Sequence, residues 1–239
     1  CNGMSSMRFE APTLLDYFAA LVADDQQFSL LEAAISVAQD DDPALDVQSV
    51  LSQIDRLAAK LKQRIAADAG AMHRLQCLNR YFFQELGFAG NVNDYYDARN
   101  SHLQHVLTTR RGIPITLALL FIEIAQQIGL DARPVSFPGH FLVKLKMPQG
   151  EVIIDPFTGQ SLSREALDER LAPYRHRQGL VGEFEAPLGL FLQAATAREV
   201  VARMLRNLKE IHRGAQDWQR LLQVQERLAY LAFDGAREP

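Results

Sequence analysis

The sequence predicts an α+β fold with a helical N-terminal region (8–88), a central core with a small antiparallel sheet (89–187) and a C-terminal helical hairpin (188–239). Apolar residues recur every three or four positions in the first and last regions, as in amphipathic helices, and alternate with other residues in HFLVKLK (140–146), as in a strand. With 48% hydrophobic residues, a chain of 239 residues can bury a full core.

The N-terminal region is predicted to consist of several helices. Pro12 suits the first turn of the first helix, and a longer amphipathic helix begins near Val47. The acidic run Asp40–Asp42 is predicted to be a solvated turn before Pro43. Cys77 lies beside an apolar stripe, and nothing in its local sequence would activate it, so we expect a small buried thiol.

A long connector, GNVNDYYDARN, precedes the central helix. Irregular stretches of this length in compact domains are typically functional or structural lids. Asn100 and Ser101 are residue types that cap helices and are predicted to start the next one. His102 and His105 have a spacing that can join a metal ion, but no further ligands complete a set, so we predict no metal site.

The central helix is predicted to begin at Pro114, where a first helical position tolerates a missing N–H, and to end at Gly129. It is apolar nearly all round and should be buried. His140 is predicted to open a strand, a hairpin turn follows at Pro148–Gly150, and Asp155 ends the second strand. Adjacent antiparallel strands would bring His140 and Asp155 together, as an orienting pair requires.

The segment after the sheet is predicted to form one short helix that ends before Pro173, followed by a solvated basic turn at Tyr174–Arg177. Two amphipathic helices separated at Gly214 complete the chain. A single helix pair cannot bury its own apolar face, so it should dock on the core, bind a partner or continue into a longer chain.

Composition argues against several classes of protein. Lys and Arg number 25 against 29 Asp and Glu, a net charge of −4, so no overall positive field favours nucleic acid or an anionic membrane. The apolar run around 113–124 is too short to cross a bilayer. Cys1 and Cys77 are too few for a disulfide framework and suit a reducing, cytoplasmic compartment.

Between Gly112 and Pro156, which include the central helix and the two strands after it, the sequence resembles the transglutaminase-like superfamily. In that superfamily a G-x-C motif opens a helix, a motif close to L-G-I-P-A-R follows, and a His and then an Asp-Pro lie on successive strands. Gly112 corresponds to the glycine of the G-x-C motif, and residues 128–133 correspond to the second motif. His140 corresponds to the family's histidine, and Asp155 to the aspartate of its Asp-Pro pair. The cysteine position of the family falls on Pro114.

Four segments resemble more closely a bacterial family of transglutaminase-like proteins with C-terminal tetratricopeptide-type helices, sometimes labelled invasion regulators. These segments are GNVNDYYDARNSHLQHVL, RRGIPITLALLFIEIA, FPGHFLV and IIDPFTG. The resemblance is strong over residues 87–159. It implies a papain-like core followed by a tetratricopeptide-like helical segment, and it names an architecture more firmly than an activity.

Proline at position 114 keeps the helix start and discards the nucleophile, because only a thiolate attacks. The side chain of Thr116 is rotated by roughly 200° from that of Pro114, and Ser136 would need a different geometry. Neither hydroxyl is therefore predicted to replace the thiol.

We thus expect a non-catalytic, degenerate transglutaminase-like protein without a cofactor, which binds a protein or peptide as a regulator or adaptor. The alternative is a hydrolase or acyltransferase that uses the His–Asp pair with an unrecognised nucleophile. A regulator linked to nucleic acid is a third class, which the acidic balance argues against. The candidate binding residues are Asn100, Arg111, Thr116, His140 and Asp155.

Overall fold

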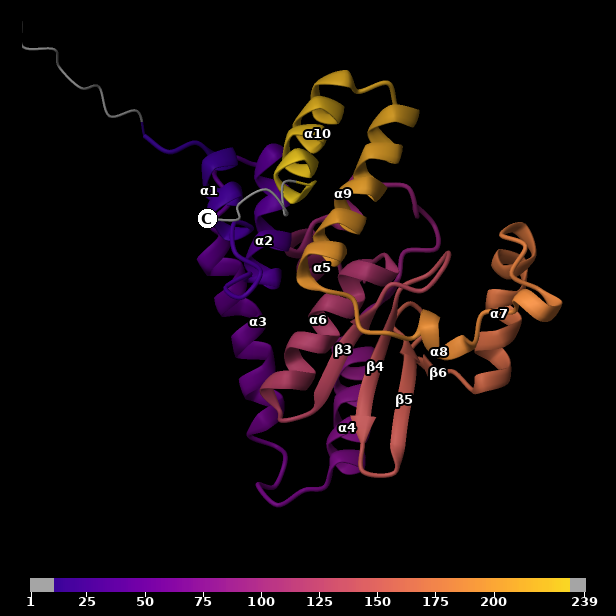
Figure 1. The fold of residues 1–239 in the computed structure, drawn as a ribbon. Helices are drawn as coiled ribbons and strands as arrows, with labels where there is room; N and C mark the ends of the chain where they lie inside the picture. The colour runs from indigo at the N-terminus through magenta and orange to yellow at the C-terminus, as the bar shows by residue number, and fades with distance from the viewer. Residues whose placement is uncertain (1–10, 233–239) are drawn as a thin grey trace, which may run out of the picture.

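The computed structural model describes residues 11–232 (Figure 1). Cys1 lies outside the described residues, as do the ends of the predicted regions 8–88 and 188–239. The α-helices are α1 (Leu14–Leu21), α2 (Leu30–Ser36), α3 (Val47–Lys62), α4 (Ala71–Asn79), α5 (Leu103–Thr109), α6 (Pro114–Gln127), α7 (Arg164–Arg177), α8 (Leu188–Phe191), α9 (Ala197–Gly214) and α10 (Trp218–Ala232). The strands are β1 (Ala89–Gly90), β2 (Arg111–Gly112), β3 (Asp131–Val135), β4 (Leu142–Met147), β5 (Gly150–Asp155) and β6 (Gln160–Ser161).

A four-stranded antiparallel sheet, ordered β3-β4-β5-β6, carries the central core. The alternation along β4 divides its side chains between two faces, as the sequence predicts. Phe141, Val143 and Leu145 join the main core with α6, whereas Leu142 packs on the other face with residues of α7 and α8. The sheet therefore has apolar layers on both sides, and Lys146, at the far end of β4, is exposed.

Helix α6 is the centre of the main core, with eleven of its fourteen residues buried. It packs between α3 and strands β3 and β4, and Figure 1 shows it beside the sheet with α3 on its outer side. The helix ends where the sequence predicts, since Gly129 has a φ of +85° that a residue without a Cβ adopts at low cost.

Two expectations for the N-terminal region are wrong. Pro12 precedes the first helix, because Thr13 is its N-cap and forms a capping box with Asp16. The acidic run is not simply a solvated turn either. Asp40 belongs to a 3₁₀ helix (Val37–Asp40) and pairs with Arg227, and Asp41 pairs with Arg220.

The helix after the sheet also differs from the prediction, because α7 continues through Pro173. A proline inside a helix removes one backbone hydrogen bond and usually ends it. Here the last turn is held by tertiary contacts. Tyr174 packs edge-on against Phe191, and Arg175, buried rather than solvated, lies 3.4 Å from Glu185. Arg175 also bonds Asp168, earlier in the same helix, at 3.0 Å.

The C-terminal hairpin of α9 and α10 docks on the rest of the chain. Figure 1 shows both helices (yellow) beside α1 and α2 (indigo), so segments near the two ends of the chain lie together. Val201 and Leu205 of α9 pack in a second apolar cluster with Phe18 of α1. Val200 and Met204, on the same helix, belong to the main core. Helix α9 is thus shared between two apolar clusters.

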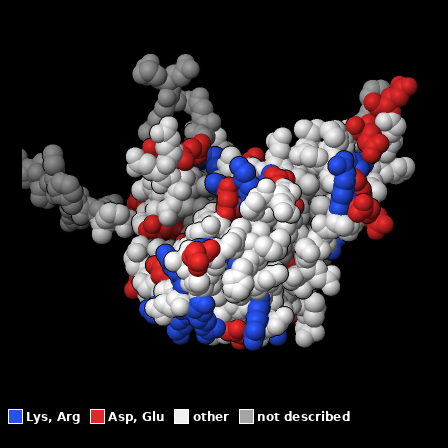
Figure 2. Space-filling model, turned by 90° about the horizontal axis from the view of Figure 1, so that it is seen from below, with Lys and Arg blue, Asp and Glu red and all other residues white. Residues whose placement is uncertain are grey.

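Acidic and basic side chains are interspersed on the face seen in Figure 2, without a continuous basic surface across it. That the chain binds no nucleic acid remains a prediction. None of the described helices has the length and apolar character needed to cross a lipid bilayer.

Arg227 clamps α10 to the N-terminal helices, and we expect its loss to weaken the fold strongly. Its side chain is 1% exposed, donates two 2.7 Å hydrogen bonds to the Asp40 carboxylate and lies over the ring of Phe18. Breaking such a buried pair from one side costs about 3–5 kcal/mol. Arg227→Ala should therefore lower the free energy of unfolding in urea by about that amount. The half-exposed Arg220 provides the control, because Arg220→Ala should cost about 1 kcal/mol or less.

Candidate functional site

The candidate site is built at the start of α6. Pro114 is the first helical residue, as predicted, and Ile113 precedes it in an extended conformation. Strand β2 leads into the helix and pairs in parallel with β1. Gly112 is required there by close packing, since a Cβ on it would lie 2.9 Å from the Thr116 hydroxyl and 3.0 Å from Val106.

His140 reaches the site from a turn. The prediction that it opens a strand is wrong, because β4 begins at Leu142. The backbone N–H of His140 donates to the Phe137 carbonyl at 3.0 Å, and Gly139 between them has a φ of +70°. The turn stops sheet pairing before His140 and leaves its imidazole partly exposed.

His140 and Asp155 form the expected pair, with 2.8 Å between His140 Nε2 and Asp155 Oδ1. The same carboxylate accepts hydrogen bonds from the Phe157 amide at 2.9 Å and from Arg170 Nη1 at 2.9 Å. Burial raises the pKa of Asp155, but the hydrogen bonds and the charge of His140, together with the other two donors, outweigh it and hold the pKa at about 2. Asp155 is thus a buried anion, and Nδ1 of His140 has no hydrogen-bond partner among the described residues.

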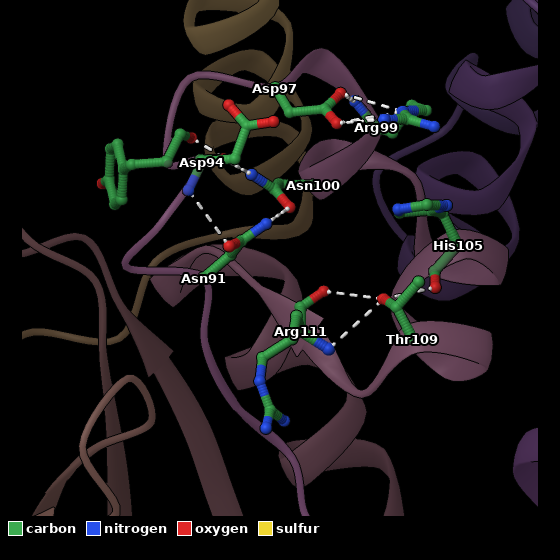
Figure 3. A network of polar contacts seen from close by, with 9 residues as sticks. Asn91, Asp94, Asp97, Arg99, Asn100, His105, Thr109 and Arg111 are labelled. Carbon is green, nitrogen blue, oxygen red and sulfur yellow. Dashed lines mark hydrogen bonds and ion pairs between the residues drawn. The ribbon is translucent and has the colours of Figure 1, made fainter.

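Asn100 organises the loop in front of the site (Figure 3). Its buried side chain donates to the carbonyls of Asp94 (2.7 Å) and Tyr95 (3.2 Å) and accepts from the Asn91 amide (3.0 Å). It does not cap α5 as predicted, because residues 98–101 form a 3₁₀ helix and His102 occupies the cap position. Asn100 therefore positions the loop that carries Tyr95.

Neither nearby hydroxyl faces His140 as a nucleophile. Thr116 is fully buried and donates its hydroxyl hydrogen to the Asn100 carbonyl at 2.8 Å. The hydroxyl of Ser136 accepts a 2.7 Å hydrogen bond from Arg203. Both groups are engaged in hydrogen bonds with the rest of the chain, and neither lines the pocket that contains Pro114 and His140.

A pocket of about 250 Å³ opens over Pro114 and His140. A second pocket of about 210 Å³ shares Tyr95, Ile113 and Asn207 with it, so the two form one groove. Its walls are the 91–97 loop, the start of α6 and helix α9. Among the described residues that line the pocket over His140 there is no Ser, Thr or Cys.

The five candidate binding residues are thus placed in different ways. His140 lines the groove, and Asp155 supports it from behind. Asn100 and Thr116 lie together beneath the loop. Arg111 is not brought to them, since its guanidinium bonds the Gly87 carbonyl at 2.7 Å and points away from Asn100 in Figure 3.

The sequence argument missed four residues of the site. Tyr95, Arg203 and Asn207 line the pocket over His140, and Arg170 bonds Asp155. Helical spacing places Arg203 and Asn207 on one face of α9, but no local signal says which part of the protein that face meets.

Two other predicted features lie away from the groove. The Cys77 thiol is half-buried and does have a histidine beside it, with Sγ 3.5 Å from His73 Nε2, one helical turn earlier. His102 lies 3.3 Å from an Asp41 oxygen. Within residues 11–232, no three His, Cys, Asp or Glu side chains gather in a way that could hold a metal ion.

The chain is similar in sequence to a known family and to several proteins of other organisms. Residues 48–206 match the family described as the transglutaminase-like superfamily. A UPF0162 protein of Xylella fastidiosa is 36% identical over 209 residues, which is 87% of this chain and 73% of that protein. A UPF0162 protein of Pseudomonas aeruginosa is 31% identical over 210 residues, 88% of this chain and 74% of that protein.

A shorter likeness reaches a eukaryotic protein. The human F-box only protein 21 is 44% identical over 70 residues, 29% of this chain and 11% of that protein. No solved structure matches the chain.

Asp155 gives the site a pH-dependent stability. Its pKa is about 2 in the folded protein against an ordinary 3.8, so its contribution is complete above about pH 4 and is lost as the pH falls toward 2. The shift corresponds to about 2 kcal/mol. In urea unfolding, Asp155→Asn should be less stable than the wild type by about that amount at pH 7, and the difference should shrink markedly between pH 4 and pH 2. A difference that does not change with pH would contradict the assignment.

Proposed function

The chain belongs to the transglutaminase-like superfamily, and from that premise we propose that it is a non-catalytic member that binds a protein or peptide segment as a regulator or adaptor. The observation that carries the proposal is the groove over Pro114 and His140. It keeps the position of a thiol-enzyme site while the residue at the nucleophile position has no reactive group.

The shape and lining of the groove favour an extended peptide. Its two connected pockets run past Tyr95 and Tyr96 on one side and α9 on the other. Tyr96 is 79% exposed and packs against Tyr95, which contacts Phe157 in turn. Exposed aromatic side chains with a polar end are common in peptide- and protein-binding surfaces.

We also propose that the chain belongs to the invasion-regulator type of this superfamily and that α9 and α10 form a tetratricopeptide-like unit. Two long amphipathic helices joined by a three-residue connection support this. Trp218 and Leu222 of α10 are 61% and 60% exposed, which leaves apolar surface on the helix farther from the core.

The rival function is a hydrolase or acyltransferase, and the intact His140–Asp155 pair favours it. Turnover of an acyl or amide substrate panel by the wild type, lost in His140→Ala and kept in Cys77→Ala, would establish catalysis and overturn the adaptor proposal.

Binding is tested with a displayed library of random dodecapeptides. We expect the wild type to enrich a sequence motif and Asn207→Trp to lose it, because Asn207 lies where the two pockets meet. Arg206→Trp is the matched control, since Arg206 is an exposed neighbour on the same helix. Equal enrichment by wild type and Asn207→Trp would show that peptides do not bind in the groove.

The inherited geometry is tested by restoring a thiol. In a background with Cys1 and Cys77 replaced by Ser, Pro114→Cys should place a thiol at the start of α6 beside His140. The helix dipole and the imidazole should lower its pKa by about one unit or more from the usual ~8.5. The pH profile of alkylation by iodoacetamide measures this, and His140→Ala should move the midpoint back up. A midpoint near 8.5 in both proteins would mean that the site does not retain the geometry of a thiol enzyme.

A further inference from the structure

Arg203 of α9 is a half-buried cation in the wall of the groove. Its Nη1 donates to Ser136 Oγ at 2.7 Å and to the Phe137 carbonyl at 3.0 Å, and its guanidinium lies 5.6 Å from the centre of the Phe141 ring. The other two nitrogens, Nε and Nη2, have no hydrogen-bond partner among the described residues. Arg203 is thus fixed in place by one nitrogen and open to a ligand through two others.

No carboxylate of the described chain neutralises Arg203. Burial lowers the pKa of Arg203, and the neighbour that opposes this shift is the Tyr95 hydroxyl, which carries no charge at pH 7. Three other arginines bond a carboxylate, since Arg227 bonds Asp40, Arg175 bonds Asp168 and Arg170 bonds Asp155. Withdrawing a cation from water without a counter-charge is costly, so a ligand that supplies one gains an interaction the protein itself does not make.

The rest of the pocket fits a small planar anion attached to an apolar segment. Ile113, Pro114 and Phe141 give it an apolar lining, and His140 and Asn207 supply polar groups. The pocket also lies at the start of α6, where the helix dipole adds partial positive charge.

The opposite end of the groove carries acidic residues. Asp97 and Glu210 line the second pocket, where each pairs with a nearby arginine. Its two arginines are already engaged by these carboxylates, whereas Arg203 has no carboxylate partner among the described residues, so Arg203 is the cation of the groove that is open to an anionic group.

We propose that the groove anchors its peptide by a carboxylate, which accepts two hydrogen bonds from Arg203 in the pocket over Pro114 and His140. The proposal rests on the proposed function and names the group that is recognised. The carboxylate is either the C-terminal one of the bound chain or an Asp or Glu side chain within it. A guanidinium with two free nitrogens suits both, because it binds a carboxylate through two parallel N–H donors.

Three matched peptide libraries separate these sources. The first has a free C-terminus and no Asp or Glu, the second has an amidated C-terminus and one Asp or Glu, and the third is amidated and without acidic residues. Binding to the full chain is measured by fluorescence polarisation at fixed ionic strength. We expect the first or the second library to bind at least about 10-fold more tightly than the third, because hydrogen bonds between charged groups contribute that much or more.

Two variants locate the anchor. Arg203→Gln should weaken binding of the carboxylate peptides by about 10- to 100-fold, and Arg206→Gln, the exposed control on α9, should leave it unchanged. Asn207→Asp places a carboxylate in the groove without removing a hydrogen bond of the described chain. It should weaken the same peptides even if Arg203→Gln fails to fold.

The outcomes distinguish the two proposals. Equal binding of all three libraries, abolished by Asn207→Trp, would overturn carboxylate recognition and keep the peptide groove. Preference for carboxylate peptides that survives both Arg203→Gln and Asn207→Asp would also overturn it. Failure of every library to bind would remove the groove proposal and the carboxylate proposal together.

Discussion

The buried start of α6 is the constraint on which the site depends. The first N–H groups of a helix have no partner within it, and α6 begins inside the core, where such groups need another partner. Pro114 has no N–H at all. The Thr116 hydroxyl accepts from the Ile113 N–H at 3.3 Å and donates to the Asn100 carbonyl. Proline and threonine at these positions therefore solve a backbone problem, and neither needs a catalytic role to be favoured there.

The same bond joins two parts of the groove. Asn100 receives the Thr116 hydrogen on its backbone carbonyl and uses its side chain to fold the 91–97 loop. The pairing of β1 with β2 holds the other end of this loop, since the Asn91 N–H donates to the Gly112 carbonyl at 2.9 Å. The loop bearing Tyr95 is thus tied to the start of α6 at both of its ends, so the groove is formed before any ligand arrives.

Retention of the His140–Asp155 pair does not require retention of catalysis. Asp155 is 1% exposed and ionised, and a buried charge is tolerated only when it is fully hydrogen-bonded. Removing His140 would leave one of three donors missing. Stability alone is therefore a sufficient reason to keep the pair, and the pair by itself does not distinguish an enzyme from a binding protein.

Local patterns in the sequence predict the parts of the fold that local physics decides. The limits of α6 follow from Pro114 and Gly129, and the faces of β4 follow from alternation. The position of His140 in a turn depends on the φ of Gly139 and was not predictable from alternation. Continuation of α7 through Pro173 depends on ion pairs made by Arg175. At His140 the local conformation of Gly139 decides, whereas at α7 a contact with Glu185, outside the helix, accompanies the departure from the local preference.

Helix α9 shows why the site itself was only half predictable. The apolar face of α9 was visible in the sequence, and Val200 and Met204 insert it into the main core. Only that docking brings Arg203 and Asn207, on the adjoining face, to a groove whose other walls come from residues 95–141. Pro114 on α6 contributes an apolar wall to the groove. The charge proposed to select a ligand is that of Arg203 on α9, and the packing of Val200 and Met204 in the main core holds this helix in place.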